Sequence, residues 1–336
     1  MNMLLVGYNA VDLFEKAKHG KKVTAKWAEG ATCHTLDIYH RHAIEKTHHL
    51  KAVCSPHLPA GPWDEIRFRT GPKRMAGELE LDLLQEIYAL APEAKLFGGN
   101  GSGPVVTLEY DGRERDRNAL LDKIRKDKAR HRDFASTWQA SLPGIEPVTF
   151  TSFPGCFCHR RQDEGGLALA EVVARDLSAL IDESTNRRID ESTNRRIDEF
   201  SLLDMGCGCG LVSLLIAKAV KGVKAVLVDS HSRAVEAAEL NAKNLGVEAE
   251  VILADNGTPA RMDGTFDVFV GNPPYYSDYR IAEVFLETAK RALKSGGVCY
   301  TVCKNAAGLE PVQRKYFPAV EIVHRRGYSV LKSVKE

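Results

Sequence analysis

The second half of the chain alternates between short apolar runs and longer amphipathic segments. Apolar runs of five to seven residues predict strands at Phe200–Met205, Val223–Val228, Glu248–Ala254, Phe266–Val270 and Val298–Cys303. The segments between them predict helices at Leu211–Val220, Ser232–Leu245 and Arg280–Lys294, and the chain ends in a predicted hairpin of Val320–His324 and Tyr328–Lys332. This alternation predicts an α/β fold with a seven-stranded, mostly parallel sheet that is covered on both faces and ends in an antiparallel hairpin.

The first half is less regular but of the same kind. Short apolar runs predict strands at Met3–Val6, Lys95–Phe97 and Val105–Tyr110. Helices are predicted at Val11–Lys18 and at Glu78–Ala91, and the second of these carries leucine and isoleucine on one face. The pattern therefore indicates another α/β domain, compatible with a degenerate copy of the fold predicted for the second half.

An eight-residue repeat separates the two halves. Ile181–Arg188, with the sequence IDESTNRR, recurs as Ile189–Arg196 and begins again at Ile197–Glu199. Isoleucines eight residues apart drift around a helix and form no apolar stripe, so we interpret the repeat as a connector. Because 336 residues are enough for two domains, we expect domains at residues 1–180 and 200–336, with a linker at residues 181–199.

Composition and charge limit the possible partners. The chain is 44% hydrophobic and 27% charged, with a formal net charge of +1. A charge this small means that any surface for nucleic acid must be a local one. No apolar stretch approaches the length needed to span a membrane, and the first residues lack the basic start of a secretory signal. We expect a cytoplasmic protein without membrane association, and we favour a monomer.

Cysteine and histidine give no metal-binding pattern. None of the eight cysteines forms a Cys-x-x-Cys pair, and in a reducing compartment they are expected to be small, semi-buried apolar residues. Six of the eleven histidines lie between His34 and His57, but their spacing matches no zinc motif. We interpret this histidine cluster as polar surface and loop, and we expect no metal.

Glycine occupies every second position after the strand predicted at Phe200–Met205. Glycine lets the backbone turn tightly and approach a ligand closely. The next strand ends at Asp229, 23 residues after the first of these glycines, where a carboxylate can accept the hydroxyls of a ribose. The third strand ends in an Asp-Asn pair, where enzymes that use S-adenosylmethionine (SAM) place a polar contact to adenine. The candidate SAM-binding residues are Asp204, Gly206, Gly208, Gly210, Asp229, Asp255 and Asn256.

The tetrapeptide Asn272-Pro273-Pro274-Tyr275 follows the strand predicted at Phe266–Val270. The Asn272 side-chain oxygen and the Pro273 carbonyl can each accept one hydrogen of a planar amine, which aims the nitrogen lone pair at a methyl group. The two prolines stiffen the turn, and Tyr275 offers a flat face on which a base can stack. With the glycine loop upstream, the motif predicts methyl transfer from SAM to a planar nitrogen.

Two basic segments are candidates for contact with RNA phosphates. The first is a run between Lys123 and Arg132, in which Asp127 is the only acidic residue. The second follows Pro154-Gly-Cys-Phe-Cys-His159 and precedes Asp163. The first can equally be a solvated helix face, and the second can be a substrate loop or an ordinary domain-linking turn. The candidate residues are Lys123, Arg125, Lys126, Arg130, Arg160 and Arg161.

These motifs together resemble the ribosomal RNA guanine-N2 methyltransferases of the RsmC/RlmG type. The resemblance rests on the tandem α/β halves, the Pro-Gly-x-Phe box at Pro154–Phe157, the Asp-x-Gly at Asp163–Gly165, the glycine loop and Asn-Pro-Pro-aromatic. It implies a catalytic second domain and a first domain that has lost SAM binding and helps to bind RNA. It also implies that Phe157 and Asp163–Gly166 lie near the cofactor or target.

The chain departs from that family after Asn-Pro-Pro, where the family usually has Phe, His and Gly. Here the residues are Tyr275-Tyr-Ser-Asp-Tyr279, a departure that leaves the methylation chemistry intact and the target nucleotide open. We expect two tandem Rossmann-like methyltransferase domains, SAM as the only cofactor, and RNA, either rRNA or a ribosomal subunit, as partner. The alternatives are glutamine-N5 methylation of a protein, whose enzymes carry a small helical N-terminal domain, adenine-N6 methylation, and a non-catalytic RNA-binding assembly factor.

Overall fold

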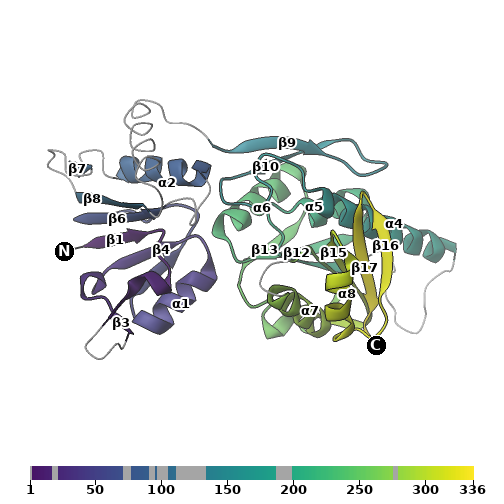
Figure 1. Cartoon of the computed structure of the whole chain (residues 1–336). Helices are drawn as coiled ribbons and strands as arrows, with labels where there is room; N and C mark the ends of the chain where they lie inside the picture. Colours follow the sequence, from purple (N-terminus) through teal and green to yellow (C-terminus); the bar gives the residue numbers. More distant parts are fainter. Residues whose placement is uncertain are drawn as a thin grey trace. The chain divides into compact units, whose positions relative to one another are not determined.

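The chain forms two compact units, shown in a computed structural model (Figure 1). The structure describes residues 2–16, 22–70, 77–90, 95–96, 105–110, 134–186, 199–274 and 279–336. The N-terminal unit comprises Met1–Ala135 with two short later segments, Phe153–Gly155 and His231–Arg233. The C-terminal unit comprises Ser136–Ser152, Cys156–Ser230 and Ala234–Glu336.

The N-terminal unit is built on a six-stranded parallel sheet with the order β5-β4-β1-β6-β8-β7. Its strands are β1 (Met3–Val6), β4 (Thr32–Thr35), β5 (Lys51–Cys54), β6 (Glu65–Thr70), β7 (Lys95–Leu96) and β8 (Val105–Tyr110). Its two helices are α1 (Ile38–His48) and α2 (Gly77–Leu90).

Alternation along β1 explains why this sheet is covered on both faces. Leu4 and Val6 pack in the cluster that contains the apolar face of α2. Met3 and Leu5 pack in the cluster that contains Ile44 of α1. Because successive side chains of a strand point to opposite faces, a strand with every residue apolar requires a helix on each side.

The C-terminal unit contains a seven-stranded sheet with the order β13-β12-β11-β14-β15-β17-β16. Its strands are β11 (Phe200–Met205), β12 (Val223–Asp229), β13 (Ala249–Leu253), β14 (Phe266–Gly271), β15 (Leu293–Cys303), β16 (Glu321–Arg325) and β17 (Tyr328–Val334). Strand β17 runs antiparallel to both β15 and β16, whereas β11 to β15 pair in parallel. The final hairpin therefore inserts β17 into the sheet and leaves β16 at the edge.

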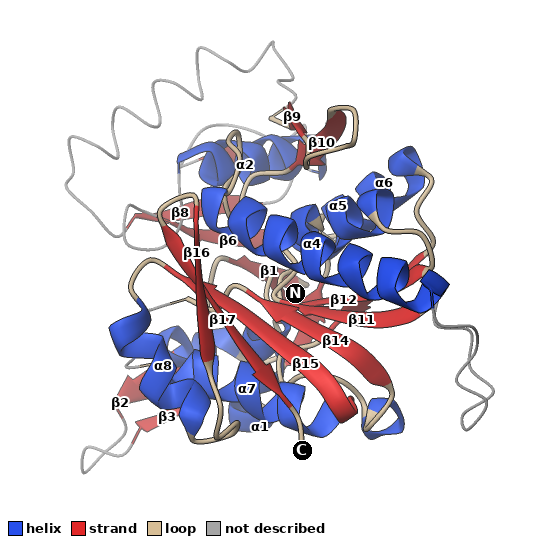
Figure 2. Ribbon diagram, turned by 90° about the vertical axis from the view of Figure 1, so that its right-hand side faces the viewer, coloured by secondary structure: helices blue, strands red, loops and turns tan. Residues whose placement is uncertain are grey.

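Helices cover both faces of this sheet, as Figure 2 shows. One layer contains α4 (Glu164–Asn186), α5 (Leu211–Ala219) and α6 (Ser232–Leu245), and the other contains α7 (Arg280–Ala292) and α8 (Ala306–Arg314). A separate two-stranded hairpin, β9 (Ser136–Ala140) and β10 (Val148–Ser152), precedes α4.

The boundary between the units differs from the one expected from the repeat. The division falls at Ala135 and Ser136, so that β9, β10 and α4 belong to the C-terminal unit. Helix α4 continues into the first copy of the repeat as far as Asn186, and residues 187–198 lie outside the described part of the chain. The repeat therefore joins α4 to β11 within the C-terminal unit.

One expectation for the N-terminal unit was wrong, and a second was correct only in part. In place of a helix at Val11–Lys18, the chain forms a short 3-10 helix, Ala10–Leu13, and then β2 (Phe14–Lys16), which pairs with β3 (Lys22–Thr24). The histidine cluster was expected to be surface and loop, and this is correct only in part: His42, His49 and His57 are exposed, but His34 lies in β4 and His48 in α1, and both are buried. His34 is buried against the carbonyl of Ser55, so its polar ring is satisfied inside the fold.

Asn241 of α6 joins β10 to the glycine loop. Its side chain is fully buried; Nδ2 donates to the carbonyls of Thr151 and Cys209, and Oδ1 accepts from Thr151 N–H at 2.8 Å. We expect Asn241→Ala to lower the free energy of unfolding by about 2–4 kcal/mol, because it leaves buried polar groups without partners. Chemical denaturation would measure the loss. Asn244→Ala, at an exposed position of the same helix, should change it by less than about 0.5 kcal/mol; equal effects would contradict the assignment.

Within the described residues, no helix is long and apolar enough to cross a membrane. The eight cysteines are free thiols, and six of them are buried. Over the same ranges, no group of three His, Cys, Asp or Glu side chains is placed to hold a metal ion.

Candidate functional site

Four parallel strands bring the predicted site residues to one edge of the C-terminal sheet. Met205 pairs with Val228 of β12 and with Gly271 of β14, and Asp229 pairs with Leu253 of β13. The carboxyl ends of parallel strands meet at the same edge, and ligands of open α/β sheets bind there. The glycine loop, Asp229, the Asp255-Asn256 pair and Asn272 consequently leave the sheet side by side.

The glycine loop adopts a backbone conformation that needs glycine. Gly206, Gly208 and Gly210 all have positive φ, at 69°, 56° and 84°. A Cβ on Gly206 would lie 2.7 Å from the ring of Phe285, whereas a Cβ on Gly208 would meet no atom within 4 Å. Gly206 therefore lets α7 pack against the loop, and Gly208 leaves open space above it, as close approach of a ligand requires.

Asp229 fixes the shape of this loop. Its Oδ2 accepts a hydrogen bond from Gly208 N–H at 2.8 Å, and the N–H groups of Gly206 and Cys207 donate to the carbonyl of Val228. One carboxylate oxygen is thus used to hold the loop. The side chain remains partly exposed, as a contact to ribose hydroxyls would need.

Asp204 lies beneath the loop at the end of β11 and is only 2% exposed. Its Oδ2 accepts from the backbone N–H of Ser213 at 3.3 Å, in the first turn of α5, where Gly210 has no side chain to cap the helix. Burial raises the pKa of Asp204 to about 7, the charge of Asp229 adds to this, and hydrogen bonds from Ser213 oppose it.

The raised pKa of Asp204 predicts a pH-dependent stability. In the unfolded chain this carboxyl titrates near 3.8 and in the folded chain near 7. The stability that the protonated Asp204 contributes is therefore fully present below pH 4 and is lost as the pH rises through 7. The loss is about 1.4 kcal/mol per unit of pKa shift. We expect the stability of Asp204→Asn to rise relative to that of the wild type as the pH is raised from 5 to 8. Chemical denaturation without ligand at each pH measures this difference. A stability difference that does not change with pH would contradict the assignment.

Asn272 is held by a residue 109 positions earlier in the chain. Its Nδ2 donates to Oδ2 of Asp163 at 2.8 Å. The same carboxylate accepts the N–H groups of Gly165 and Gly166 in the first turn of α4. Burial raises the pKa of Asp163, and these backbone and amide donors partly offset the rise. The contact turns the amino end of the Asn272 amide toward Asp163 and its oxygen end away from Asp163.

Of the other predicted residues, six lie in the described part of the chain and five lie outside it. Asp255 and Asn256 follow β13 at the same edge, and the Asn256 side chain is exposed. Pro273 is buried beside Asn272, and Pro274 is half-buried. The exposed Arg160 and Arg161 lie in the loop before α4, where Cys158 and Arg160 both have positive φ. Outside the described residues are Tyr275, Lys123, Arg125, Lys126 and Arg130.

Tyr328, at the start of β17, was not predicted as a site residue. A Cβ on Gly165 would lie 3.1 Å from the Tyr328 ring, so this tyrosine packs against the first turn of α4. The ammonium of Lys304 lies 4.3 Å from the ring centroid, which is cation–π geometry. No local motif marks either residue, because they meet only when β15 and β17 pair.

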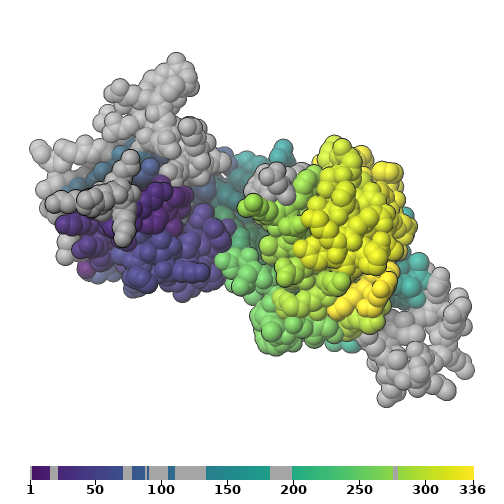
Figure 3. Space-filling view, turned by 60° about the horizontal axis from the view of Figure 1, so that its bottom comes forward, coloured from purple at the N-terminus to yellow at the C-terminus, as the bar shows by residue number. Residues whose placement is uncertain are grey.

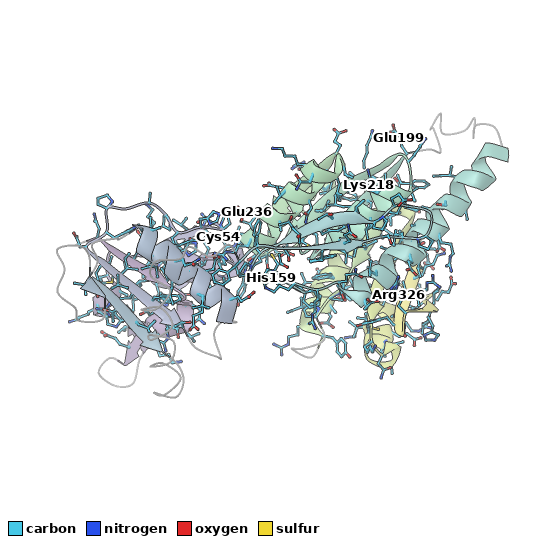
Figure 4. The ribbon with its side chains drawn as sticks, turned by 90° about the horizontal axis from the view of Figure 1, so that it is seen from above. Cys54, His159, Glu199, Lys218, Glu236 and Arg326 are labelled. Carbon is cyan, nitrogen blue, oxygen red and sulfur yellow. The ribbon has the colours of Figure 1, made fainter. Side chains whose placement is uncertain are left out.

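The final hairpin is attached to α4 by ion pairs. Arg326 donates to Glu171 at 2.7 Å and to Glu164 at 2.9 Å, and Arg325 also donates to Glu171. Figure 4 shows Arg326 on the hairpin beside α4. Residues of this hairpin, yellow in the space-filling view, form part of the surface of the C-terminal unit (Figure 3). The hairpin is therefore attached to the helix whose N-cap residue, Asp163, holds Asn272.

Comparison with protein families gives this arrangement a name. Residues 147–332, more than half of the chain, match the methyltransferase small domain. The chain belongs to the methyltransferase small domain family. The cofactor of this methyltransferase is SAM. The open space at Gly208 and the partly exposed Asp229 fit such a cofactor at the edge of the sheet.

Curated relatives of this methyltransferase carry the name ribosomal RNA small subunit methyltransferase C. The protein from Haemophilus influenzae (strain PittGG) is 24% identical over 208 residues, which cover 61% of this chain and 56% of the relative. The protein from Marinomonas sp. (strain MWYL1) is 29% identical over 188 residues, 54% of this chain and 47% of the relative. The chain thus spans about half the length of the curated relatives it matches.

A solved structure matches the methyltransferase over its whole length. It is the 16S rRNA N2 methyltransferase RsmC of T. thermophilus, in complex with AdoMet and guanosine, with a TM-score of 0.72 and 16% identity over 100% of this chain and 88% of that chain. At this identity the likeness establishes the fold. The resemblance drawn from the sequence motifs is confirmed at the level of the family.

Proposed function

We propose that this methyltransferase transfers a methyl group from SAM to the exocyclic amine of a base in RNA, namely guanine N2 of ribosomal RNA. The observation that carries the proposal is Asn272. It follows β14 beside the glycine loop, with its amide orientation fixed by Asp163. The names of the curated relatives, and the guanosine bound to the structural relative, support the choice of base and of RNA.

In this proposal, the carboxyl edge of the sheet holds the cofactor. Gly206, Gly208 and Gly210 shape the loop around it, Asp204 supports the loop from below, and Asp229 accepts ribose hydroxyls. Asp255 and Asn256 contact the adenine. When bound, SAM supplies a methyl group that is electrophilic because it is attached to a sulfonium.

The acceptor amine is positioned by the Asn-Pro-Pro-Tyr turn. Oδ1 of Asn272 and the carbonyl of Pro273 each accept one amino hydrogen, which raises the electron density on the nitrogen and orients its lone pair. Pro274 keeps the turn rigid, and Tyr275 stacks on the base. A planar amine conjugated to a base is only weakly basic, so orientation and hydrogen bonding are the contributions that the chain can make without a strong base.

The N-terminal unit is proposed to be a methyltransferase-like domain that has lost SAM binding. The strands β5-β4-β1-β6 repeat the order β13-β12-β11-β14 of the C-terminal unit. After β1, however, only Gly7 has positive φ, and the next residue, Tyr8, is buried. A buried tyrosine at this turn fills space that a cofactor would need. We propose that this unit binds RNA, together with Arg160 and Arg161 of the C-terminal unit and Lys123, Arg125, Lys126 and Arg130.

The deciding experiment is transfer of radiolabelled methyl from SAM to total rRNA from cells that lack this gene, with the modified nucleoside identified by mass spectrometry. N2-methylguanosine is expected. Label in protein only would replace the proposal with glutamine-N5 methylation, and N6-methyladenosine would change the base. The six-stranded sheet of the N-terminal unit speaks against the glutamine alternative, whose enzymes have a small helical domain there.

A non-catalytic RNA-binding role is tested by the cofactor. Isothermal titration calorimetry with SAM is expected to show one site on the C-terminal unit. Absence of binding at millimolar SAM would replace the enzyme proposal with an assembly role.

A further inference from the structure

The Asp163 carboxylate makes more contacts than a helix cap needs. Its Oδ1 accepts from Gly165 N–H at 3.1 Å, and its Oδ2 accepts from Gly166 N–H at 3.0 Å. These two bonds satisfy the second and third N–H groups of α4, which is the task of an N-cap side chain. Oδ2 also accepts from Nδ2 of Asn272 at 2.8 Å, the shortest of the three contacts.

A carboxylate can only accept hydrogen bonds, whereas an amide has a donating and an accepting end. The end of Asn272 that faces Asp163 must therefore be the amino group, and the carbonyl oxygen must point the other way. An asparagine without such a neighbour can rotate by half a turn and present its amino group to the acceptor amine. In that orientation two donors would face each other, and the acceptor nitrogen would lose its hydrogen-bond acceptor.

We propose that Asp163 is a positioning residue that fixes the Asn272 amide with its oxygen toward the methyl-accepting amine. This inference rests on the proposed function of Asn272, and it names the group that makes that function possible. Asp163 acts through Asn272 and does not touch the substrate.

The glycines after Asp163 make room for this arrangement. A Cβ on Gly166 would lie 2.8 Å from Oδ2 of Asp163, and a Cβ on Gly165 would lie 3.4 Å from Oδ1. Glycine is an unfavourable residue within a helix, and two in succession at the start of α4 weaken it. Their presence is explained by the need to keep the carboxylate close to both the helix and Asn272.

Three substitutions distinguish positioning from capping. Asp, Asn and Ser are nearly equivalent N-caps, so a capping role alone predicts that Asp163→Asn and Asp163→Ser behave like the wild type. The positioning role predicts a different order. In Asp163→Asn, the amide oxygen at the Oδ2 position can still accept from both Gly166 N–H and Nδ2 of Asn272, so the Asn272 amide keeps its orientation. In Asp163→Ser, the short hydroxyl caps the helix and leaves Asn272 free to rotate.

The experiment measures kcat and KM for methyl transfer to unmethylated rRNA, the Kd of SAM, and the thermal midpoint for each variant. Asp163→Ser is expected to lower kcat about 10- to 10²-fold, Asp163→Asn to keep kcat within about threefold of the wild type, and both to keep the wild-type Kd for SAM, KM for rRNA and thermal midpoint. In the Asn272→Ala background, Asp163→Ser should change kcat by less than about twofold, because the amide that Asp163 orients is absent.

Either of two results would overturn the inference: wild-type kcat in Asp163→Ser, or a loss from Asp163→Ser in the Asn272→Ala background as large as in the wild type. A fall in thermal midpoint that parallels the fall in kcat would also overturn it, since that indicates a structural role. The proposed function fails separately, when the wild-type enzyme leaves rRNA unlabelled but methylates a protein or an adenine; the same order of variants is then measured on that acceptor. A wild-type enzyme that methylates none of these overturns both proposals.

Discussion

Asn272→Ala is expected to lower kcat for methyl transfer about 10²- to 10³-fold, the usual effect of removing one preorganised hydrogen-bonding group from an active site. The substitution removes the proposed acceptor for the amine hydrogen. It leaves the glycine loop and Asp229 in place. The Kd of SAM should therefore stay within about twofold of the wild type, because the lost contact acts on the acceptor and not on the cofactor.

Steady-state kinetics on unmethylated rRNA and calorimetry with SAM together check this expectation. Asn244→Ala, at an exposed position of α6, is the matched control and should keep wild-type kcat. Full activity in Asn272→Ala would remove Asn272 from the mechanism. A parallel loss of SAM binding would show instead that the turn serves to hold the cofactor.

Gly208→Ala should weaken SAM binding and should also lose some stability, because an alanine is strained at the positive φ of this position. A Cβ at this position points into open space in the structure, so any loss of affinity must come from the volume that the cofactor occupies. A methyl group forced into a filled site is destabilising by about 1–3 kcal/mol, which corresponds to about a 5- to 150-fold rise in Kd. Calorimetric titration of SAM measures the rise directly.

Gly246→Ala is the control for backbone strain. Gly246 has a φ of 62°, close to the 56° of Gly208, and a Cβ there also meets no atom within 4 Å. Both variants should lose a similar amount of stability, about 1–2 kcal/mol, but only Gly208→Ala should lose affinity for SAM. Equal affinities in the two variants would mean that Gly208 does not face the cofactor.

The C-terminal sheet was largely predictable because its strands are buried on both faces. Phe200–Met205 was predicted to the residue, and the end of β14 was missed only by Gly271. Buried parallel strands give continuous apolar runs, and the helices between them are amphipathic, so the local pattern and the final structure agree. The insertion of β17 between β15 and β16 has no such signal, because strand order depends on long-range pairing.

The N-terminal unit shows where local patterns fail. Asn9 and Asp12 form a capping box, which normally marks the start of a helix. Here it starts only a short 3-10 helix, Ala10–Leu13, and Phe14–Lys16 then pair with β3; eight residues are too few for a helix to resist such pairing. Helix α1 was missed because it is rich in polar residues and histidine, with few apolar positions to give a period.

The residues proposed to hold the cofactor could be named from the sequence, whereas the contacts that support Asn272 could not. Glycine spacing and the acids after each strand follow the chain order, so the sequence shows them directly. The contact of Asp163 with Asn272 joins residues far apart in the sequence; the segment was expected near the site, but its partner could not be named. The stack of Lys304 on Tyr328 has the same origin in the pairing of β15 with β17.

The position of the eight-residue repeat has an evolutionary consequence. Helix α4 starts beside Asn272 and runs for 23 residues, about 35 Å. It ends within the first repeat copy, and the rest of the repeat leads to β11. Strand β11, which is about 20 Å long, then leads back to the glycine loop. A gene that gains or loses one repeat unit by replication slippage thus changes the chain at the amino ends of the strands, whereas the proposed chemistry lies at their carboxyl ends. Closely related strains could differ in the number of repeat units and still share one catalytic rate.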